Sequence, residues 1–216
     1  MPNFLPLLAR SYSSTRCSAG TEATKNGLRA LLRQTAQPVA VVTSILKRDP
    51  DVYHGATLSS FTSIAMDPLP LVAFALRIPS RMADSLNTLS SHMVINLLSA
   101  EQATIATTFS RADLYPHPFS TTPYFLNKDG LPVIRGSLGA VACKLVSKVP
   151  LRDLGHAYTA EEKIPDRTNG SELFIAEVLR VEEGVLRGDA LPLLYHRRVY
   201  TTCTPSDLDH PEPHSK

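Results

Sequence analysis

Apolar positions along the chain gather into short, nearly continuous runs separated by turn-forming residues, a pattern typical of buried β-strands. The clearest runs are residues 39–46, 52–58, 71–76, 93–98, 138–149 and 173–181. Shorter segments with helical character are residues 27–34, 82–90 and 99–109, and Ser80 and Ser99 are candidate N-caps. Residues 47–51 have the composition of a turn, so the first two strands should form a hairpin. The pattern predicts a mainly β protein, with several buried strands in a β-barrel and helices at its periphery.

Two long connections interrupt this pattern. Residues 110–131 carry several prolines and aromatic side chains, and residues 151–171 are polar. A polar connection as long as residues 151–171 is usually functional or disordered when it lies inside a compact domain. A dinucleotide-binding parallel fold is disfavoured, because no Gly-x-Gly-x-x-Gly follows the first strand and strands do not alternate regularly with helices.

Composition narrows the class of protein further. The 216 residues are 43% hydrophobic and 19% charged, which describes one globular domain rather than a disordered chain. A net charge of +2 gives no footprint for nucleic acid, and no apolar run approaches the roughly 20 residues of a membrane-spanning helix. Cys17, Cys143 and Cys203 are widely separated and fit a reducing compartment. Neither cysteines nor histidines have metal-ligand spacing, so no metal site is expected.

The first twenty residues differ from the rest of the chain. Their charged side chains are Arg10 and Arg16, and the first acidic residue is Glu22, while leucines and hydroxyl residues fill much of the segment. This composition predicts a mitochondrial transit peptide and a location in the matrix; the alternative is a disordered N-terminus on a cytoplasmic protein. We therefore expect a presequence over residues 1–20, one domain over residues 21–203 and a disordered tail over residues 204–216.

The stretch His54-Gly55-Ala56-Thr57-Leu58-Ser59-Ser60-Phe61, followed by Pro79-Ser80-Arg81, carries the candidate chemistry. Backbone N–H groups, short hydroxyls and one guanidinium are the groups that bind a phosphorylated cofactor. Each also has a structural interpretation. Ser80 could simply cap a helix and Arg81 could be a solvated charge, while Thr57, Ser59 and Ser60 could satisfy their own backbone at a strand end.

Taken in order, several motifs resemble the flavin reductase-like, FMN-binding split-barrel family. They lie at residues 38–43, 55–63, 67–68, 79–81, 94–98, 109–110, 136–140 and 192–200, the last ending in Leu-Leu-Tyr-His-Arg-Arg-Val-Tyr. The resemblance implies a Greek-key split β-barrel that forms homodimers, with flavin in a groove near the dimer interface. It also implies an NAD(P)H-dependent flavin oxidoreductase that passes hydride from NADH or NADPH to FMN, with FAD as an alternative flavin. Reduced flavin would go on to oxygen or to a partner such as an oxygenase.

The same resemblance suggests which residues bind the cofactor. They are Thr57, Ser59, Ser60, Ser80, Arg81, Asn96, Phe109 and Ser110. Asn96 lies in an otherwise apolar strand, where an unpaired carboxamide is costly, so it is either a flavin ligand or a structural pin. Phe109 is either a flavin contact or a core residue at a helix end.

One departure from the family affects the nicotinamide site. Many reductases of the family carry a Gly-Asp-His triplet before the last core strand, and its histidine helps to hold the nicotinamide. The corresponding residues here are Asn169-Gly170-Ser171. His156, in the long polar loop, and His196 are candidate replacements, the first if the loop folds over the groove rather than being a surface insertion. Two other functions remain open: an FMN-binding carrier or partner protein without reductase activity, and a flavoenzyme for a specific organic substrate.

Overall fold

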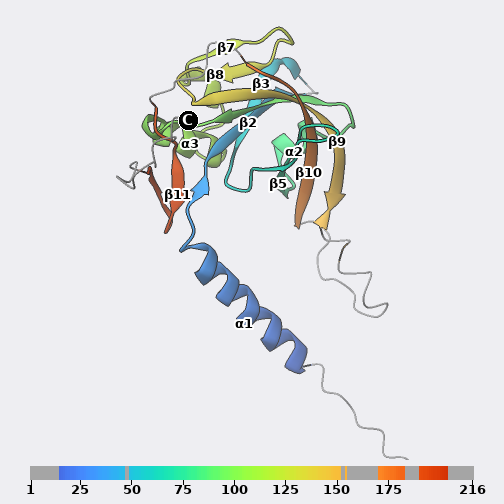
Figure 1. Cartoon of the computed structure of the whole chain (residues 1–216), viewed down its shortest axis with the longest axis vertical. Helices are drawn as coiled ribbons and strands as arrows, with labels where there is room; N and C mark the ends of the chain where they lie inside the picture. Colours follow the sequence, from blue (N-terminus) through green and yellow to red (C-terminus); the bar gives the residue numbers. More distant parts are fainter. Residues whose placement is uncertain (1–14, 47–48, 152–153, 155–169, 183–189, 204–216) are drawn as a thin grey trace, which may run out of the picture.

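A seven-stranded antiparallel sheet forms the body of the molecule (Figure 1). The computed structural model describes residues 15–46, 49–151, 154, 170–182 and 190–203. The strand order is β3-β2-β6-β9-β10-β5-β4. Their bounds are β2 Ala40–Leu46, β3 Asp49–Leu58, β4 Thr62–Ala65, β5 Leu71–Ile78, β6 His92–Leu97, β9 Gly139–Pro150 and β10 Gly170–Val181. The predicted mainly β class is thus confirmed.

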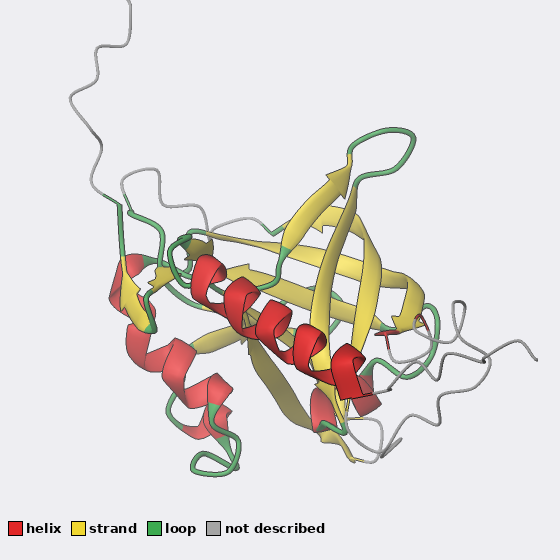
Figure 2. Cartoon of the chain, turned by 90° about the horizontal axis from the view of Figure 1, so that it is seen from below, coloured by secondary structure: helices red, strands yellow, loops and turns green. Residues whose placement is uncertain are grey.

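The sheet curls on itself, so that β3 and β5 come into contact although other strands lie between them in the sheet order (Figure 2). No backbone ladder joins these two described strands, which leaves the barrel open along this seam. The hydroxyl of Ser60, just after β3, instead donates to the Ala75 carbonyl of β5 at 3.3 Å and accepts from the Ala75 N–H at 2.9 Å.

Smaller elements surround the sheet. A three-stranded sheet contains β1 Gln37–Pro38, β11 Leu194–His196 and β12 Val199–Thr201, and a hairpin contains β7 Tyr124–Leu126 and β8 Pro132–Ile134. The helices are α1 Thr15–Leu32, α2 Arg81–Ser85, α3 Ala103–Ser110 and the short 3₁₀ turns η1 Ala100–Gln102 and η2 Pro118–Ser120. None of the described helices is long and apolar enough to cross a membrane.

The main core fills the concave side of the curled sheet. Phe74 of β5 and Phe174 of β10 are directly paired in register and stack with ring centroids 5.4 Å apart. Both are fully buried, as are Val42, Ile95 and Met82 around them. Burial of large apolar side chains stabilises the fold by roughly 1.5–3 kcal/mol each, which explains why the strands read as continuous apolar runs.

Four of the six predicted strands match closely, and the other two, β3 and β10, are longer than predicted. The helices deviate more. α2 ends at Ser85 rather than near residue 90, because Leu86 leaves the helical conformation with a φ of −94° and a ψ of 22°. Ser90, within the range expected to be helical, has a positive φ of 73°. α1 begins at Thr15, well before residue 27, and extends away from the sheet (Figure 1). The presequence residues 1–14, most of the 151–171 loop with His156, and the 204–216 tail lie outside the described residues.

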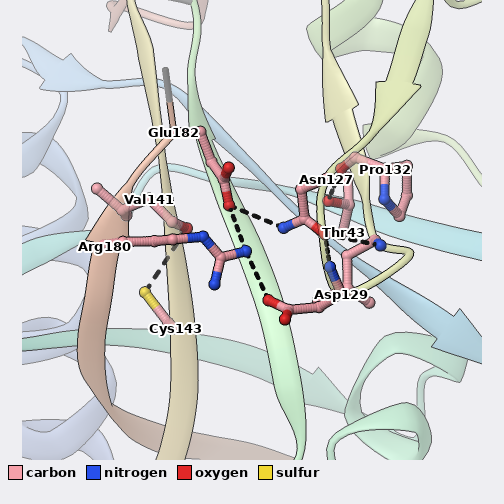
Figure 3. Close-up of polar contacts among 9 residues, drawn as sticks. Thr43, Asn127, Asp129, Pro132, Val141, Cys143, Arg180 and Glu182 are labelled. Atoms are coloured by element: carbon pink, nitrogen blue, oxygen red, sulfur yellow. Dashed lines mark hydrogen bonds and ion pairs between the residues drawn. The ribbon is translucent and has the colours of Figure 1, made fainter.

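A charged network fastens β10 to the hairpin turn between β7 and β8 (Figure 3). The Arg180 guanidinium lies 2.5 Å from an Asp129 oxygen and 2.9 Å from a Glu182 oxygen. The Asn127 amide donates to the same Glu182 oxygen at 2.8 Å. Glu182 is buried, so Arg180 and Asn127 supply the partners that its carboxylate needs.

Candidate functional site

A cleft of about 850 Å³ opens at the seam between β3 and β5, a volume within the range of about 300–1,000 Å³ that ligand pockets occupy. β3 and the turn after it form one wall, and β5 with the start of α2 forms another. The end of α3 and the tyrosines of β11 and β12 complete it. Seven of the eight predicted cofactor-binding residues line this cleft: Thr57, Ser59, Ser60, Ser80, Arg81, Phe109 and Ser110. These seven residues come from three separate segments, namely β3 with the turn after it, the start of α2 and the end of α3.

Positive charge dominates the cleft. Arg77 and Arg81 both line it, and no carboxylate of the described residues pairs with either guanidinium. Asp113 also lines the cleft, but Arg111 donates to its two oxygens at 3.1 and 2.9 Å. Those hydrogen bonds lower the pKa of the Asp113 carboxyl and offset its charge. The cleft is therefore suited to an anionic ligand.

Ser80 caps a helix, which is the structural role that the sequence also allowed for it. Its hydroxyl oxygen accepts a hydrogen bond from the Ala83 N–H at 3.2 Å and caps α2. A hydroxyl also carries one hydrogen to donate, so capping leaves Ser80 able to donate to a ligand oxygen in the cleft. Its neighbour Arg81 is exposed, and its backbone carbonyl accepts from Ser85 at 2.9 Å, which fixes the turn that presents the guanidinium.

The hydroxyl side chains at the end of β3 and in the turn after it differ in their contacts. Thr57 donates to the Ala106 carbonyl of α3 at 2.7 Å and so joins the strand to the helix. Ser60 closes the seam to β5 as described above. Ser59 is exposed, and within the described part of the chain no hydrogen bond engages its side chain. Ser59 is thus the hydroxyl of this stretch with the most freedom to bind a ligand.

Gly55 lets α3 pack closely against β3. A Cβ at this position would lie 2.8 Å from two ring atoms of Phe109 and 3.0 Å from the Val42 carbonyl oxygen. Phe109 is 4% exposed and belongs to a core cluster, yet it also lines the cleft, so both of its predicted roles are compatible with its position. The adjacent Ser110 hydroxyl donates to the Thr107 carbonyl at 2.9 Å.

Asn96 does not join this group. It is fully buried in β6, and its amide nitrogen donates to the Val41 carbonyl at 3.1 Å and to the Thr43 hydroxyl at 3.3 Å. Its amide oxygen accepts from the Ile134 N–H at 2.9 Å. These bonds tie β2, β6 and β8 together, and Asn96 is not among the described residues that line the cleft. Of the two roles that the sequence left open for Asn96, its hydrogen bonds match that of a structural pin.

Histidines are placed differently from the expectation. His54 was not predicted to be a cofactor ligand, but it is buried in the cleft wall. Its pKa is lowered mainly by burial and secondly by the positive charge of Arg81. His196 is half-buried in β11 and, of the described residues, its neighbour Tyr195 rather than His196 lines the cleft. His54 could have been identified from the sequence, because it is a polar residue directly before Gly55 in an otherwise apolar strand.

Comparison with known proteins agrees with this geometry. The sequence model of the flavin reductase like domain family matches residues 32–204, so the chain belongs to that family. It is 30% identical over 132 residues to an NADH-dependent flavin reductase of a Rhodococcus species, covering 61% of this chain and 72% of that protein.

Two solved structures share the fold. One is the NADH:FAD oxidoreductase SgcE6 of Streptomyces globisporus C-1027, with a TM-score of 0.66 and 22% identity over 87% of this chain and 96% of that chain. The other is BorF, the flavin reductase component of a bacterial two-component tryptophan halogenase, with a TM-score of 0.61 and 24% identity over 82% and 97%. These likenesses confirm the split-barrel fold expected from the sequence.

Proposed function

We propose that this protein is an NAD(P)H-dependent flavin oxidoreductase that holds FMN, or FAD in its place, in the cleft between β3 and β5. The observation that carries this proposal is the Arg81 guanidinium, which no described carboxylate neutralises, in a cleft lined by seven residues predicted to bind the cofactor. The name of the Rhodococcus relative supports the same activity.

The residues present fit a flavin mononucleotide. Arg81 offers a fork of N–H donors to the phosphate, and Ser80 can add a hydroxyl donor. Ser59 and the backbone beside it can bind the ribityl chain or the polar ring edge. Phe109 and the neighbouring tyrosines exclude water from the apolar part of the ring. When bound, the flavin accepts hydride from NADH or NADPH, and the protein contributes binding, orientation and solvent exclusion.

The visible absorption spectrum of the purified protein, recorded with FMN before and after anaerobic NADH and NADPH, tests the proposal. Flavin bands that bleach within seconds support the reductase. Bands that persist with both nucleotides contradict reductase activity but retain flavin binding. The absence of protein-bound flavin after adding FMN and FAD and removing the unbound fraction contradicts the cofactor assignment.

A second candidate function follows from the departure noted in the sequence. Ser171 stands where many family members have histidine, and it pairs in register with Arg77 in the cleft wall. The position where the family has its histidine is therefore next to the cleft and holds a serine here. The loss of the imidazole favours a flavin-binding carrier protein or a flavoenzyme for an organic substrate. Persistent flavin bands in the test above would select this candidate.

We also propose a homodimer. Leu28, Leu31 and Leu32 form one apolar stripe on α1 and are 54%, 64% and 46% exposed. An exposed apolar helix face of this kind is typical of an interaction surface. A second copy is the partner that the family resemblance suggests.

Two further proposals concern the protein's surroundings. The composition of residues 1–20 supports import into the mitochondrial matrix, which microscopy of a fusion carrying a C-terminal fluorescent protein would test, with the 1–20 deletion as its control. The name of BorF, the flavin reductase component of a two-component tryptophan halogenase, supports a second protein component as the acceptor of reduced flavin, and the family resemblance suggests an oxygenase for that component. Product formation by such an oxygenase, driven by this protein and NADH, would test the acceptor.

A further inference from the structure

A second hollow adjoins the cleft. We call it the annex, defined by the lining residues Tyr53, His54, Arg81, His117, Phe119 and Tyr124, and its volume is about 330 Å³. His54 and Arg81 line both the annex and the cleft. The two hollows are therefore neighbours on either side of these two side chains, and a ligand phosphate at Arg81 would lie at their junction.

The wall of the annex is aromatic. The Tyr53 ring packs edge-on against Phe119 and Tyr124, with centroid distances of 6.0 and 5.7 Å. The centroids of the Phe119 and Tyr124 rings are 5.1 Å apart. Prolines 116 and 118 add apolar surface at the rim. An aromatic wall of this kind stacks well with a nucleobase, because every base has a π face.

Charge in the annex also suits a nucleotide. Arg81 is positive, and no carboxylate is among the described residues that line the annex. An aromatic wall beside a cation, with no carboxylate among the described lining residues, matches a base joined to a phosphate. In the proposed binding mode the ring and the ribityl phosphate of FMN both lie in the cleft, so FMN leaves the annex free.

We propose that the annex binds the adenosine phosphate end of a dinucleotide whose other end occupies the cleft. This inference rests on the proposed function. The base stacks on the wall formed by Tyr53, Phe119 and Tyr124, and the diphosphate crosses the junction at Arg81. FAD and NADH both carry this adenosine phosphate group, so either can supply it.

Calorimetric titrations of FMN, FAD and NAD⁺, each into the flavin-free protein, test the annex. The matched variants are His117→Glu and His117→Gln, since His117 is exposed and lines the annex but not the cleft. A carboxylate in the annex should repel the phosphates of the dinucleotide and raise its Kd about fivefold, whereas Gln should leave the Kd nearly unchanged. Tyr124→Leu, which removes a stacking face, should weaken the same dinucleotide by about fivefold or more.

Each outcome decides the question. If the variants bind FAD more weakly but FMN as before, the annex binds the adenosine phosphate end of FAD. If they bind NAD⁺ more weakly, the annex binds the adenosine phosphate end of the nicotinamide coenzyme. Equal weakening of FMN and FAD, or no effect of His117→Glu on either dinucleotide, overturns the inference. A wild-type protein that binds neither flavin contradicts the proposed function itself. If the Tyr124→Leu protein does not fold, the comparison of His117→Glu with His117→Gln still decides the question.

Discussion

At the scale of single residues, Arg81 bears most of the proposed anion binding. Replacing Arg81 with Ala should raise the Kd of FMN roughly tenfold or more, because a hydrogen bond to a charged group contributes about 1.5–3 kcal/mol. Fluorescence titration of FMN measures the change. Riboflavin is the matched control ligand, since it lacks the phosphate and its affinity should stay nearly constant. Equal losses for FMN and riboflavin would show that Arg81 does not bind the phosphate.

Gly55 makes the contact between β3 and α3 possible, and Gly55→Ala tests its importance. The new Cβ would meet the Phe109 ring at 2.8 Å and the Val42 carbonyl at 3.0 Å. Overpacking of this kind typically costs about 1–3 kcal/mol, so the free energy of unfolding in urea should fall by that amount.

Gly27→Ala is the control for Gly55→Ala. Gly27 lies in α1, and nothing is within 4 Å of a Cβ placed there. The control should leave stability unchanged or raise it, because Ala favours a helix by roughly 0.5–1 kcal/mol over Gly. A Gly55→Ala protein as stable as the control would contradict the close approach of Phe109.

His54 gives the stability a pH dependence. Burial and Arg81 lower its pKa in the folded state below the ordinary 6.5. The unfolded state then binds more protons than the folded state as pH falls through 6.5, so the free energy of unfolding should decrease toward acid. His54→Gln should flatten this slope between about pH 7 and 5, whatever it does to stability at neutral pH. Urea unfolding at several pH values measures the slope, and an identical slope in both proteins would refute the prediction.

At the scale of elements, the sequence was informative where residues interact with near neighbours. The apolar runs located the six main strands, and the Gln102 side chain accepts from the Ser99 N–H at 3.0 Å, as the predicted N-cap at Ser99 suggests. The short strands β1, β4, β7, β8, β11 and β12 were not predicted, and β7 lies in the segment 110–131 that was expected to be a loop. Strands of two to four residues have too little periodicity to be recognised and depend on distant partners. The sequence left the role of Asn96 open between flavin ligand and structural pin, since its partners Val41 and Ile134 are far away in the chain.

The network on Arg180 shows how such distant contacts hold an element in place. Arg180→Ala should lower the free energy of unfolding by about 1–3 kcal/mol, because it removes one of the two partners of the buried Glu182 carboxylate. The double variant Arg180→Ala/Glu182→Gln should recover part of the loss, since it removes the buried charge as well. Urea unfolding checks both proteins. A double variant less stable than the single one would mean that Arg180 contributes through its packing rather than its charge.

At the scale of the whole molecule, α1 is the element that the rest of the described chain leaves uncovered. Its residues 22–32 are all exposed, although three of them are leucines on one face. In proteins most of the stability of a helix comes from the packing of its apolar face on another surface. The proposed homodimer supplies that surface, so light scattering after gel filtration should give twice the mass of one chain.

Leu28→Glu/Leu31→Glu should convert this dimer to a monomer, because two carboxylates would be buried at the interface. Asn26→Glu/Ala30→Glu is the matched control, since it adds the same charge to exposed positions on the opposite face of α1 and should leave the dimer intact. Dissociation by both variants would point to net charge rather than the leucine stripe. A wild-type protein that is monomeric at micromolar concentration would contradict the homodimer, and the leucines of α1 would then need a different partner.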